Sequence, residues 1–513
     1  MNDTINRLRA ARRAALDEAR TVAVQKQHTK GKLTARERIA ALLDEGSFRE
    51  VGRLVQPLDV EQYCPADAII VGHGLIDGRS VIACASDFTV LGGSSGHTGS
   101  LKLRHMAQRA LEEGVPFILL LEGGGKRIQE GLDSRLFAEG GSMFQSQVNL
   151  SGWVPTVAVI LGPGFAAPSN LASMCDFVVM VRGKSTMGMA GPALVKAGIG
   201  EDIEAEALGG AAIQADRTGV ASLAVDSEYE ALSAVRTYLS YLPANADQPA
   251  PTKQCTDAIE RDPVTCAELV PANPRRAYDV RAVLRMLADE NTVFEIRPTY
   301  AKNIVIAFAR LEGRPVGFVA NQAQTLGGML TSAACEKAAH FISVCDAFGL
   351  PLVFLIDMPG FSVGSRAEAT GLARRSARLV FELGQATVPR ASVVLRKGYG
   401  GGFMVMAGGR NFDPDLSVAW PTAEICAMNI EGAVNIAFGK ELAAAADPDA
   451  ERAARIAKVR ERTDVLRAAE GFGIDDVIEP HETRALLVET FARAPARRKS
   501  RPQTGRRHAI SPI

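Results

Sequence analysis

The chain alternates short apolar runs with longer stretches in which apolar and polar residues mix at helical spacing. Two of the apolar runs, Val115–Leu121 and Leu350–Ile356, are about seven residues long, and an acidic residue and glycine follow each. Runs of this length predict buried strands and are far too short to span a membrane. Helices are predicted before them, at residues 98–113 and 333–348. Strands that alternate with helices in this way predict an α/β fold with parallel sheets.

Further strands are predicted on either side of these elements. A β-hairpin comes first, at 68–71 and 80–85 in one half of the chain and at 305–309 and 316–320 in the other. A second buried strand comes last, at 157–161 and at 392–395, and runs into a glycine-rich turn and another helix. Right-handed crossovers place such turns at the carboxyl ends of the strands, where α/β proteins bind their ligands.

The two halves are copies of one segment. Adding 235 to positions near residue 100 aligns Lys102 with Lys337 without a gap. Further along the offset becomes 234, which aligns Gly164-Phe165-Ala166-Ala167 with Gly398-Tyr399-Gly400-Gly401. A period this long is inconsistent with a solenoid and indicates one domain fold used twice. Each copy has a glycine-rich turn at the same place, which suggests two equivalent oxyanion sites.

A proline-rich and polar stretch at 242–251 is the clearest linker. We therefore expect an N-terminal domain at residues 1–250 and a C-terminal domain at residues 251–513. Residues 1–45 are predicted to form helices, with Thr34 and Glu37 as a capping box.

Composition narrows the possible functions. The 58 basic residues balance the 58 acidic ones, and aromatic residues make up 6%, so neither nucleic acid nor an anionic membrane surface is expected as a partner. The eight cysteines form no C-x-x-C pair, which indicates reduced thiols in the cytoplasm and favours neither a disulfide framework nor a bound metal. The basic run 497–507 is interpreted as a solvated tail.

The glycine turn of the second half, residues 398–402, offers backbone donors to an oxyanion. A strand stops there and a helix begins, and the first N–H groups of a helix have no partner within it. Because glycine has no side chain, a ligand oxygen can approach these donors, which typically stabilise a developing charge by a few kcal/mol. The alternative is a turn that serves only close packing of helix on strand, and two equivalent turns make that alternative weaker.

The equivalent turn of the first half, residues 162–168, is less permissive. Ala166 and Ala167 keep their N–H groups but add methyl groups, and Pro168 suits the first turn of a helix. The loop Glu122–Arg127 has the glycines to cradle a phosphate or an adenine-bearing group, with Lys126 and Arg127 as cations, or it is only a structural loop.

No side chain stands out as a general base. His73, His97, His105 and His340 show no partner pattern and are interpreted as packed or surface residues. Known motifs for a nucleophilic serine, a zinc protease, a P-loop or a dinucleotide site are absent from the sequence. A reaction run by backbone donors needs no such base if the substrate or a cofactor supplies one.

The chain resembles the carboxyltransferase β subunit of biotin-dependent acyl-CoA carboxylases, the propionyl-CoA and methylcrotonyl-CoA carboxylase family. The resemblance covers nearly the whole chain. The strings that carry it are His28–Ile39, Asp87–Gly93, Arg127–Gly131, Gly200–Asp202, Leu208–Gly210, Gly313–Gly317, Ala320–Gln322, Cys345–Phe348, Asp357–Phe361, Ala386–Pro389, Ala419–Thr422 and Gly432–Asn435.

The resemblance implies two tandem crotonase-like (ClpP/crotonase) domains in a homohexameric ring. It implies that the first domain serves the acyl-CoA and the second serves biotin, which arrives on a separate carrier protein. The carboxyl group then moves to the α, or vinylogous γ, carbon of the acyl-CoA. Biotin acts as both carrier and base, an oxyanion on the biotin side is held by Gly400, Gly401 and Gly402, and the enolate oxygen is held by Ala166 and Ala167.

The resemblance and the loops together assign further site residues. Coenzyme A is expected at Gly123, Gly124, Gly125, Lys126, Arg127, Gly164 and Phe165. The biotin or acyl pocket is expected at Tyr399, Phe403 and Met404. No biotin attachment motif or ATP-binding domain is present, so a separate α subunit is expected to supply the biotin carboxylase and the carrier.

The chain departs from the family pattern at several positions. The family usually has Gly-Gly at 166–167, Ser-Gly-Gly-Ala at 123–126 and histidine at Gln214, and its short-chain members have aspartate at Met404. All of these changes except Met404 lie in the first half. The altered turn and the flexible, apolar Met404 favour a branched or longer acyl group over acetyl. Two alternatives remain: a non-catalytic scaffolding paralogue in a mixed ring, and a biotin-dependent acyl-CoA decarboxylase subunit. A crotonase-type hydratase is disfavoured, because no pair of carboxylates flanks the first turn.

Overall fold

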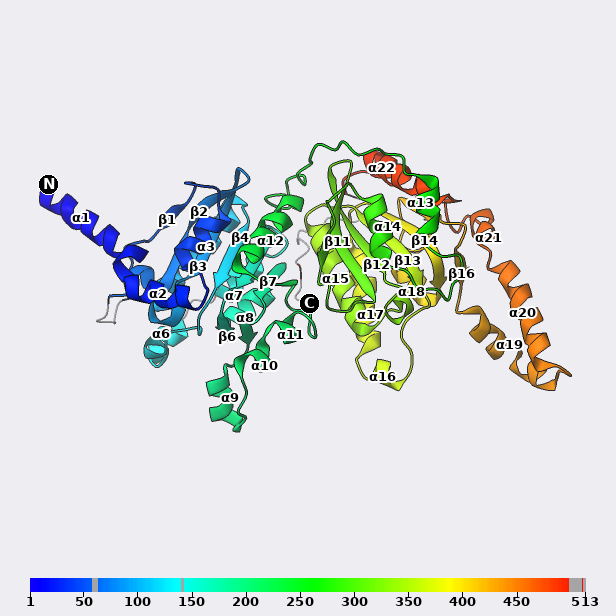
Figure 1. The fold of residues 1–513 in the computed structure, drawn as a ribbon, viewed down its shortest axis with the longest axis horizontal. Helices are drawn as coiled ribbons and strands as arrows, with labels where there is room; N and C mark the ends of the chain where they lie inside the picture. Colours follow the sequence, from blue (N-terminus) through cyan, green and yellow to red (C-terminus); the bar gives the residue numbers. More distant parts are fainter. Residues whose placement is uncertain (58–62, 140–142, 498–509, 511–513) are drawn as a thin grey trace. The chain divides into compact units, whose positions relative to one another are not determined.

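The structure is a computed structural model that describes residues 1–57, 63–139, 143–497 and 510. The chain divides into two compact units, Met1–Pro249 with Arg507–Ile513, and Ala250–Arg506. Each unit is built around one mixed β-sheet with helices packed on it (Figure 1), so the expected α/β class is confirmed. Among the described residues, no helix is long and apolar enough to cross a membrane.

The sheet of the first unit has seven strands in the order β1-β2-β3-β4-β5-β7-β9. Their bounds are β1 Arg49–Val51, β2 Ile69–Ile76, β3 Arg79–Ser86, β4 Phe117–Leu121, β5 Thr156–Ile160, β7 Phe177–Val181 and β9 Leu223–Val225. The first three strands are antiparallel, and β3 to β9 run parallel. β4 and β5 are buried along their whole length, which explains why their sequences read as continuous apolar runs.

Helices connect the parallel strands. α4 (His97–Glu113) joins β3 to β4, and α8 (Ala167–Ser173) leads into β7. The remaining helices are α5 Ile128–Gly131, α6 Ser134–Glu139, α7 Met143–Leu150, α9 Pro192–Ile199, α10 Ala205–Gly209, α11 Ala211–Gln214 and α12 Glu228–Tyr241. A separate pair of short strands, β6 (Pro163–Phe165) and β8 (Thr186–Gly188), lies outside the sheet and shapes the turn that precedes α8.

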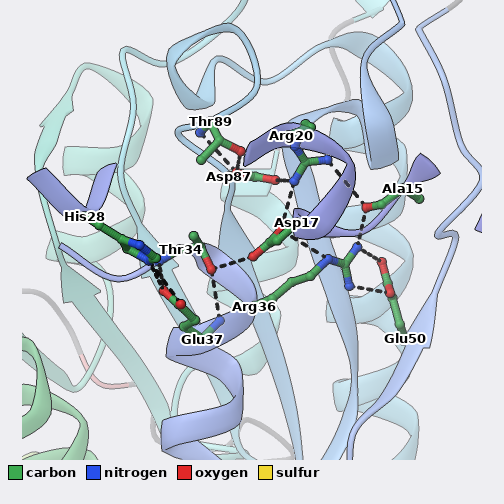
Figure 2. A network of polar contacts seen from close by, with 10 residues as sticks. All are labelled: Ala15, Asp17, Arg20, His28, Thr34, Arg36, Glu37, Glu50, Asp87 and Thr89. Atoms are coloured by element: carbon green, nitrogen blue, oxygen red, sulfur yellow. Dashed lines mark hydrogen bonds and ion pairs between the residues drawn. The ribbon is translucent and has the colours of Figure 1, made fainter. Parts of the chain in front are cut away.

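The N-terminal segment consists of α1 (Asn2–Ala14), η1 (Asp17–Arg20), α2 (Thr21–Thr29) and α3 (Ala35–Leu42), and the predicted capping box at the start of α3 is present. Figure 2 shows how polar contacts tie this segment to the sheet. Arg20 donates to Asp87, just after β3, at 2.9 Å, and Arg36 makes a two-pronged contact with Glu50 of β1 at 2.7 and 3.0 Å.

The second unit repeats the plan. Its sheet runs β10-β11-β12-β13-β14-β15-β17, with β16 paired to β14. The strands are β10 Phe294–Ile296, β11 Ile304–Leu311, β12 Arg314–Asn321, β13 Leu352–Met358, β14 Arg390–Tyr399, β15 Leu416–Ala419, β16 Glu424–Cys426 and β17 Asp476–Val477. The helices of eight or more residues are α14 Val280–Leu287, α15 Ser332–Ala347, α17 Leu372–Gln385, α19 Ile430–Ala444, α20 Pro448–Arg462 and α22 Thr483–Arg493, and the shorter ones are α13 Pro263–Glu268, α16 Ser365–Glu368, α18 Gly400–Val405 and α21 Val465–Glu470.

Several predicted strands are longer in the structure. The two hairpins extend to eight residues per strand, because every position pairs across β2 with β3 and β11 with β12. β14 covers Arg390–Tyr399 rather than 392–395, since it pairs first with β15 and then with β16. Arg497, at the start of the predicted solvated tail, donates to Thr387 at 2.8 Å and is therefore bound, while Arg498–Arg507 lie outside the described residues.

Candidate active site

The loop after β4 lies against the turn that precedes α8. A Cβ atom built on Gly125 would stand 3.6 Å from the carbonyl oxygen of Phe165 and 3.8 Å from the Cβ of Ala166. The loop is fixed on its other side by Ser95, whose N–H donates to Gly125 O at 2.9 Å and whose carbonyl accepts from Arg127 N–H at 2.9 Å. The structure therefore brings together the two glycine-rich segments that the sequence assigned to this site.

Ala166 and Ala167 have different roles in the first turn. The N–H of Ala166 donates to the carbonyl of Gly188 at 2.8 Å, so it is not available to a ligand, contrary to the expectation of two donors here. Ala167 is the first residue of α8, and within the described residues no acceptor faces its N–H. Gly125 likewise has no acceptor for its N–H within the described part of the chain. The first turn thus offers Ala167, with Gly125 beside it.

Ala166 adopts a backbone conformation that disfavours a side chain. Its φ of 64° and ψ of −126° lie outside the regions that L-residues usually populate. Ser169, which the sequence did not single out, holds the turn: its hydroxyl lies 2.6 Å from Gly164 O and accepts from Gly188 N–H at 2.7 Å. Serine in the first turn of a helix after a glycine turn is a signal that points to this type of contact.

Replacing Ala166 with glycine is therefore expected to stabilise the protein by about 1 kcal/mol. Relief of backbone strain of about 1–3 kcal/mol outweighs the roughly 0.5–1 kcal/mol that glycine costs in chain entropy. Urea unfolding, followed by a signal from the first unit, measures the change in the free energy of unfolding. Ala167→Gly is the matched control, since φ at this position is not positive and the substitution is expected to destabilise. Equal destabilisation by both variants would contradict the strained conformation of Ala166.

The second turn has a positive φ at the aligned position. Gly400, which aligns with Ala166, has a φ of 62°, and Gly400–Gly402 are the first three residues of α18. A Cβ on Gly401 would meet no atom closer than 3.6 Å, a ring carbon of Phe361, whereas a Cβ on Gly402 would collide with Met358. Gly401 is therefore the exposed position of this turn at which a ligand can approach the backbone.

The three residues expected in a biotin or acyl pocket differ in burial and in contacts in the structure. Tyr399 is buried, and its hydroxyl donates to Glu424 at 2.5 Å. Burial and the Glu424 carboxylate raise the pKa of Tyr399, so the phenol stays protonated. Phe403 packs against the backbone of its own turn, within 3.4 Å of the Cβ position of Gly409. Met404, with 47% of its surface exposed, is the member of the three that faces outward.

A buried carboxylate begins the loop on the acyl side. Glu122 directly follows β4, and its side chain is fully buried. Its carboxylate contacts Arg38 at 2.5 Å, Lys32 at 2.8 Å and Gln27 at 2.9 Å. Arg38 also binds Glu228 at 2.8 Å. Cations and an amide from the N-terminal segment thus hold the start of the Gly123–Gly125 loop.

The second unit holds the carboxylate at the aligned position with different partners. Asp357, which aligns with Glu122, contacts the guanidinium of Arg396 at 3.0 Å and the backbone N–H of Lys397 at 3.1 Å. Arg396 aligns with Gly162, where a Cβ would stand 2.6 Å from Glu122 and 2.7 Å from Lys32. The glycine in the first copy leaves space for the N-terminal cations, and the arginine in the second copy supplies its own. Neither Lys32 nor Arg38 was recognised from the sequence as part of the site.

Arg127 does not present its charge to a ligand as expected. Its side chain is 1% exposed and forms ion pairs with Asp67 at 2.7 Å and Glu130 at 2.8 Å. It therefore fixes the loop through these two ion pairs. Lys126 is half-buried, with its ammonium group 5.3 Å from the ring centre of Phe137.

A cavity of about 300 Å³ opens beside the first turn. Gly123, Gly125, Lys126, Ala167 and Pro168 line its edge. Its walls come from the ends of β2, β3 and β4 and from α4, α7 and α8. Gly164 and Phe165 do not line it, and Phe165 instead packs on Gly188 and Gly191.

The four histidines considered in the sequence lie in different surroundings. His340 is buried, and this burial, with the nearby charge of Arg297, lowers its pKa well below the usual range and keeps the ring neutral. His97 lines the cavity from the start of α4, where its N–H donates to Glu130 at 2.5 Å. His73 and His105 line neither this cavity nor the two turns.

One cluster of side chains is close enough together to hold a metal ion. Among the described residues, ligand atoms of Cys255, Asp257 and Asp289 lie within 4.8 Å of one another. Asp289 is already engaged by Arg484 at 2.7 Å and by the N–H of Gly313 at 2.7 Å. The cluster lies in the second unit, in the segment before β10 that makes neither turn.

Known proteins match the chain along its length. Residues 26–509 match the family model of the carboxyl transferase domain. The carboxyltransferase subunit of propionyl-CoA carboxylase from Haloferax mediterranei is 40% identical over 100% of both chains. A crystal structure of transcarboxylase 12S, a hexamer with methylmalonyl-coenzyme A bound, superposes with a TM-score of 0.93 at 38% identity, covering 99% of this chain and 98% of that one. A single-chain long-chain acyl-CoA carboxylase superposes at 0.85 with 34% identity, covering 95% of this chain and 48% of that one.

These matches cover both copies of the internal repeat. The likeness to transcarboxylase 12S covers both units, and the sequence identity is far above the level at which only the fold is shared. The chain therefore belongs to the carboxyl transferase family and is a carboxyltransferase subunit of the acyl-CoA carboxylase type.

Proposed function

We propose that the chain transfers the carboxyl group of carboxybiotin, carried on a separate protein, to the α carbon of an acyl-CoA, and that each turn holds one oxygen during the transfer. The single observation that carries this proposal is the shared backbone of the two turns. Ala166 and Gly400 have φ values of 64° and 62°, and a helix begins directly after or at each of them. Backbone donors at aligned places in the two copies suit a reaction with two oxyanions.

The first turn is proposed to hold the thioester oxygen of the acyl-CoA. Negative charge develops on this oxygen when the α-proton leaves, and the Ala167 N–H at the positive end of the α8 dipole would stabilise it, with Gly125 as the neighbouring donor. The contacts of Arg38 with Glu122 and of Ser169 with Gly164 hold the two donor segments in place. Preorganised donors of this type need not rearrange during the reaction.

The second turn is proposed to face the carboxyl donor. Bound biotin supplies the carboxyl group and a nitrogen base for the α-proton. The residues present fit such a ligand, because Gly401 is exposed and has no side chain to cover the first N–H groups of α18, and Met404 adds an exposed apolar surface. The chain's part is to bind the urea oxygen of this donor through backbone N–H groups. This division of work needs no side-chain base in either turn.

The partners follow from this assignment. We infer a biotin carboxylase and a biotin carrier as partners on a separate α subunit, since the sequence has no biotin attachment motif. A homohexamer is proposed from the likeness to transcarboxylase 12S, whose structure is described as a hexamer. All eight cysteines are free thiols, which supports a cytoplasmic location. Propionyl-CoA is the acyl substrate named for the Haloferax relative, and it belongs in any substrate panel.

The test is to isolate the protein from its own cells with its bound partners and to assay carboxylation. We expect a biotinylated, ATP-binding partner and incorporation of labelled bicarbonate into an acyl-CoA that depends on ATP. Co-purification with a membrane partner and loss of CO2 from the acyl-CoA would instead indicate a decarboxylase. No labelling of any acyl-CoA by an intact complex would contradict the proposal.

His97→Gln is expected to change the rate of carboxylation by less than about tenfold. His97 lines the cavity beside the first turn, so among the four histidines it is the strongest candidate for a general base. Loss of a general base typically costs 100-fold or more. Steady-state kinetics of the folded variant measure the effect, with His105→Gln on the exposed face of α4 as the control. A loss of about a thousandfold in His97→Gln would show that a side chain removes the α-proton.

A further inference from the structure

The cavity beside the first turn has an apolar interior. The residues that line it and are less than a tenth exposed include Ile69, Leu121, Met143 and Leu171. They come from the start of β2, the end of β4, α7 and α8, and so close the cavity on several sides. Its volume of about 300 Å³ is roughly ten times the volume that one water molecule occupies in the liquid. The interior is thus large enough for several carbon atoms.

The charged side chains that line the cavity, Lys126 and Arg104, are half-buried. Of the polar side chains in the lining, Ser86 at the end of β3 is buried, whereas Ser95, His97 and Ser100 are half-buried. Phe137 and Phe144, which also line it, are 64% and 43% exposed. A phosphate or a peptide-like amide placed between Leu121 and Leu171 would lose its hydration without gaining partners, whereas a hydrocarbon chain would gain from the same burial.

The mouth of the cavity coincides with the proposed oxyanion donor. Ala167 and Gly125 both line it, and Ala167 carries the N–H that has no acceptor among the described residues. A thioester whose oxygen binds this N–H therefore has one of its substituents at the cavity mouth. The polar pantetheine chain matches the exposed edge with Lys126, and the acyl chain matches the apolar interior.

We propose that this cavity is an acyl pocket, and that the chain prefers acyl-CoAs whose acyl group is longer or more branched than propionyl. The proposal rests on the proposed function, because it uses the same donor and the same substrate. Met143 suits the role, since its flexible thioether side chain adapts to different chain shapes. One methylene group in such a pocket changes specificity by about tenfold or more.

The test compares acetyl-, propionyl-, butyryl-, hexanoyl- and isovaleryl-CoA as substrates of the complete complex. For the unaltered protein we expect kcat/KM to be at least about tenfold higher for the best of the longer or branched substrates than for acetyl-CoA. Leu171→Phe fills the cavity and is expected to lower kcat/KM for the longer substrates by about tenfold while changing that for acetyl-CoA by less than about twofold. Met143→Ala enlarges the cavity and should shift the optimum to a longer chain. Leu8→Phe on α1, a helix without buried residues, is the control.

Two kinetic results and one binding result would overturn the proposal. An equal loss for every substrate in Leu171→Phe would show that the cavity receives part of coenzyme A, and unchanged preferences in both folded variants would show that the acyl chain lies elsewhere. Calorimetric measurement of the binding of the same acyl-CoAs to the complex distinguishes failure of the acyl pocket from failure of the proposed function. If no substrate is carboxylated but affinity rises with chain length and Leu171→Phe removes the rise, the pocket stands and the transfer reaction fails. An affinity independent of chain length overturns the pocket itself.

Discussion

Replacement of Gly401 by proline is expected to reduce carboxyl transfer by about 100-fold or more, the typical cost of losing one oxyanion donor. Gly401 is the second residue of α18, a position where proline is tolerated because the N–H has no partner within the helix. A Cβ at this position would lie 3.6 Å from its nearest neighbour, a ring carbon of Phe361, which is an ordinary van der Waals contact. The substitution therefore removes one donor from the second turn with little effect on the fold. Steady-state assays with the carrier and an acyl-CoA measure the loss.

Gly401→Ala is the matched control, because it adds a methyl group but keeps the N–H. Ala167 occupies the equivalent position of the first turn, so the repeat itself shows that alanine fits this backbone. We expect the alanine variant to remain within about tenfold of the unaltered protein. If the proline variant folds, assembles and remains fully active, backbone donation at the second turn is not part of the reaction. If both variants are equally impaired, the side chain blocks the site and the donor is not identified.

Replacement of Arg38 by methionine is expected to destabilise the protein by about 3–5 kcal/mol. The guanidinium, which is 1% exposed, contacts both Glu122 and Glu228, and these carboxylates are themselves 0% and 4% exposed. Removal of one partner from a buried ion pair leaves an uncompensated charge without water to solvate it. Because Glu122 begins the loop on the acyl side, we also expect a raised KM for the acyl-CoA. Urea unfolding and kinetics on the same preparation measure the two effects.

Arg452→Met provides the comparison for this variant. Arg452 contacts Asp449 at 3.1 Å on α20, where both side chains are well exposed, and exposed ion pairs contribute about 0–1 kcal/mol. The two substitutions remove the same group from a pair with a carboxylate and differ in burial. A decrease of less than about 1 kcal/mol in the free energy of unfolding of Arg38→Met would show that Lys32 and Gln27 satisfy Glu122 without the guanidinium.

The repeat made much of the fold and site predictable from the sequence. Apolar runs buried on both faces, such as Val115–Leu121, identified the parallel strands, and the alignment of Gly164–Ala167 with Gly398–Gly401 located both turns. Features that depend on contacts distant in sequence were not visible. The N–H of Ala166 is bound by Gly188 because β6 pairs with β8, and strands of three residues leave almost no pattern in a sequence.

The electrostatic support of the site was missed for a similar reason. Glu122 is held by Arg38, 84 positions earlier in the chain, and nothing in the local sequence of either residue signals the pair. Arg127 was expected to face a ligand because it follows a glycine loop, but Asp67 and Glu130 draw its side chain inward. The alignment of Gly162 with Arg396 was the signal available in the sequence. The second copy has an arginine where the first copy has a glycine that leaves space for Lys32.

The central claim is that the first turn serves the acyl-CoA and the second turn serves the carboxyl donor. The most direct test measures acyl-CoA affinity and carboxyl transfer from a preloaded, labelled biotin carrier on the same Gly401→Pro complex. We predict that the acyl-CoA Kd stays within about twofold of the unaltered value while the transfer rate falls by about 100-fold or more. Loss of acyl-CoA binding in parallel with transfer would place the acyl-CoA at the second turn and contradict the account, as would transfer at the unaltered rate.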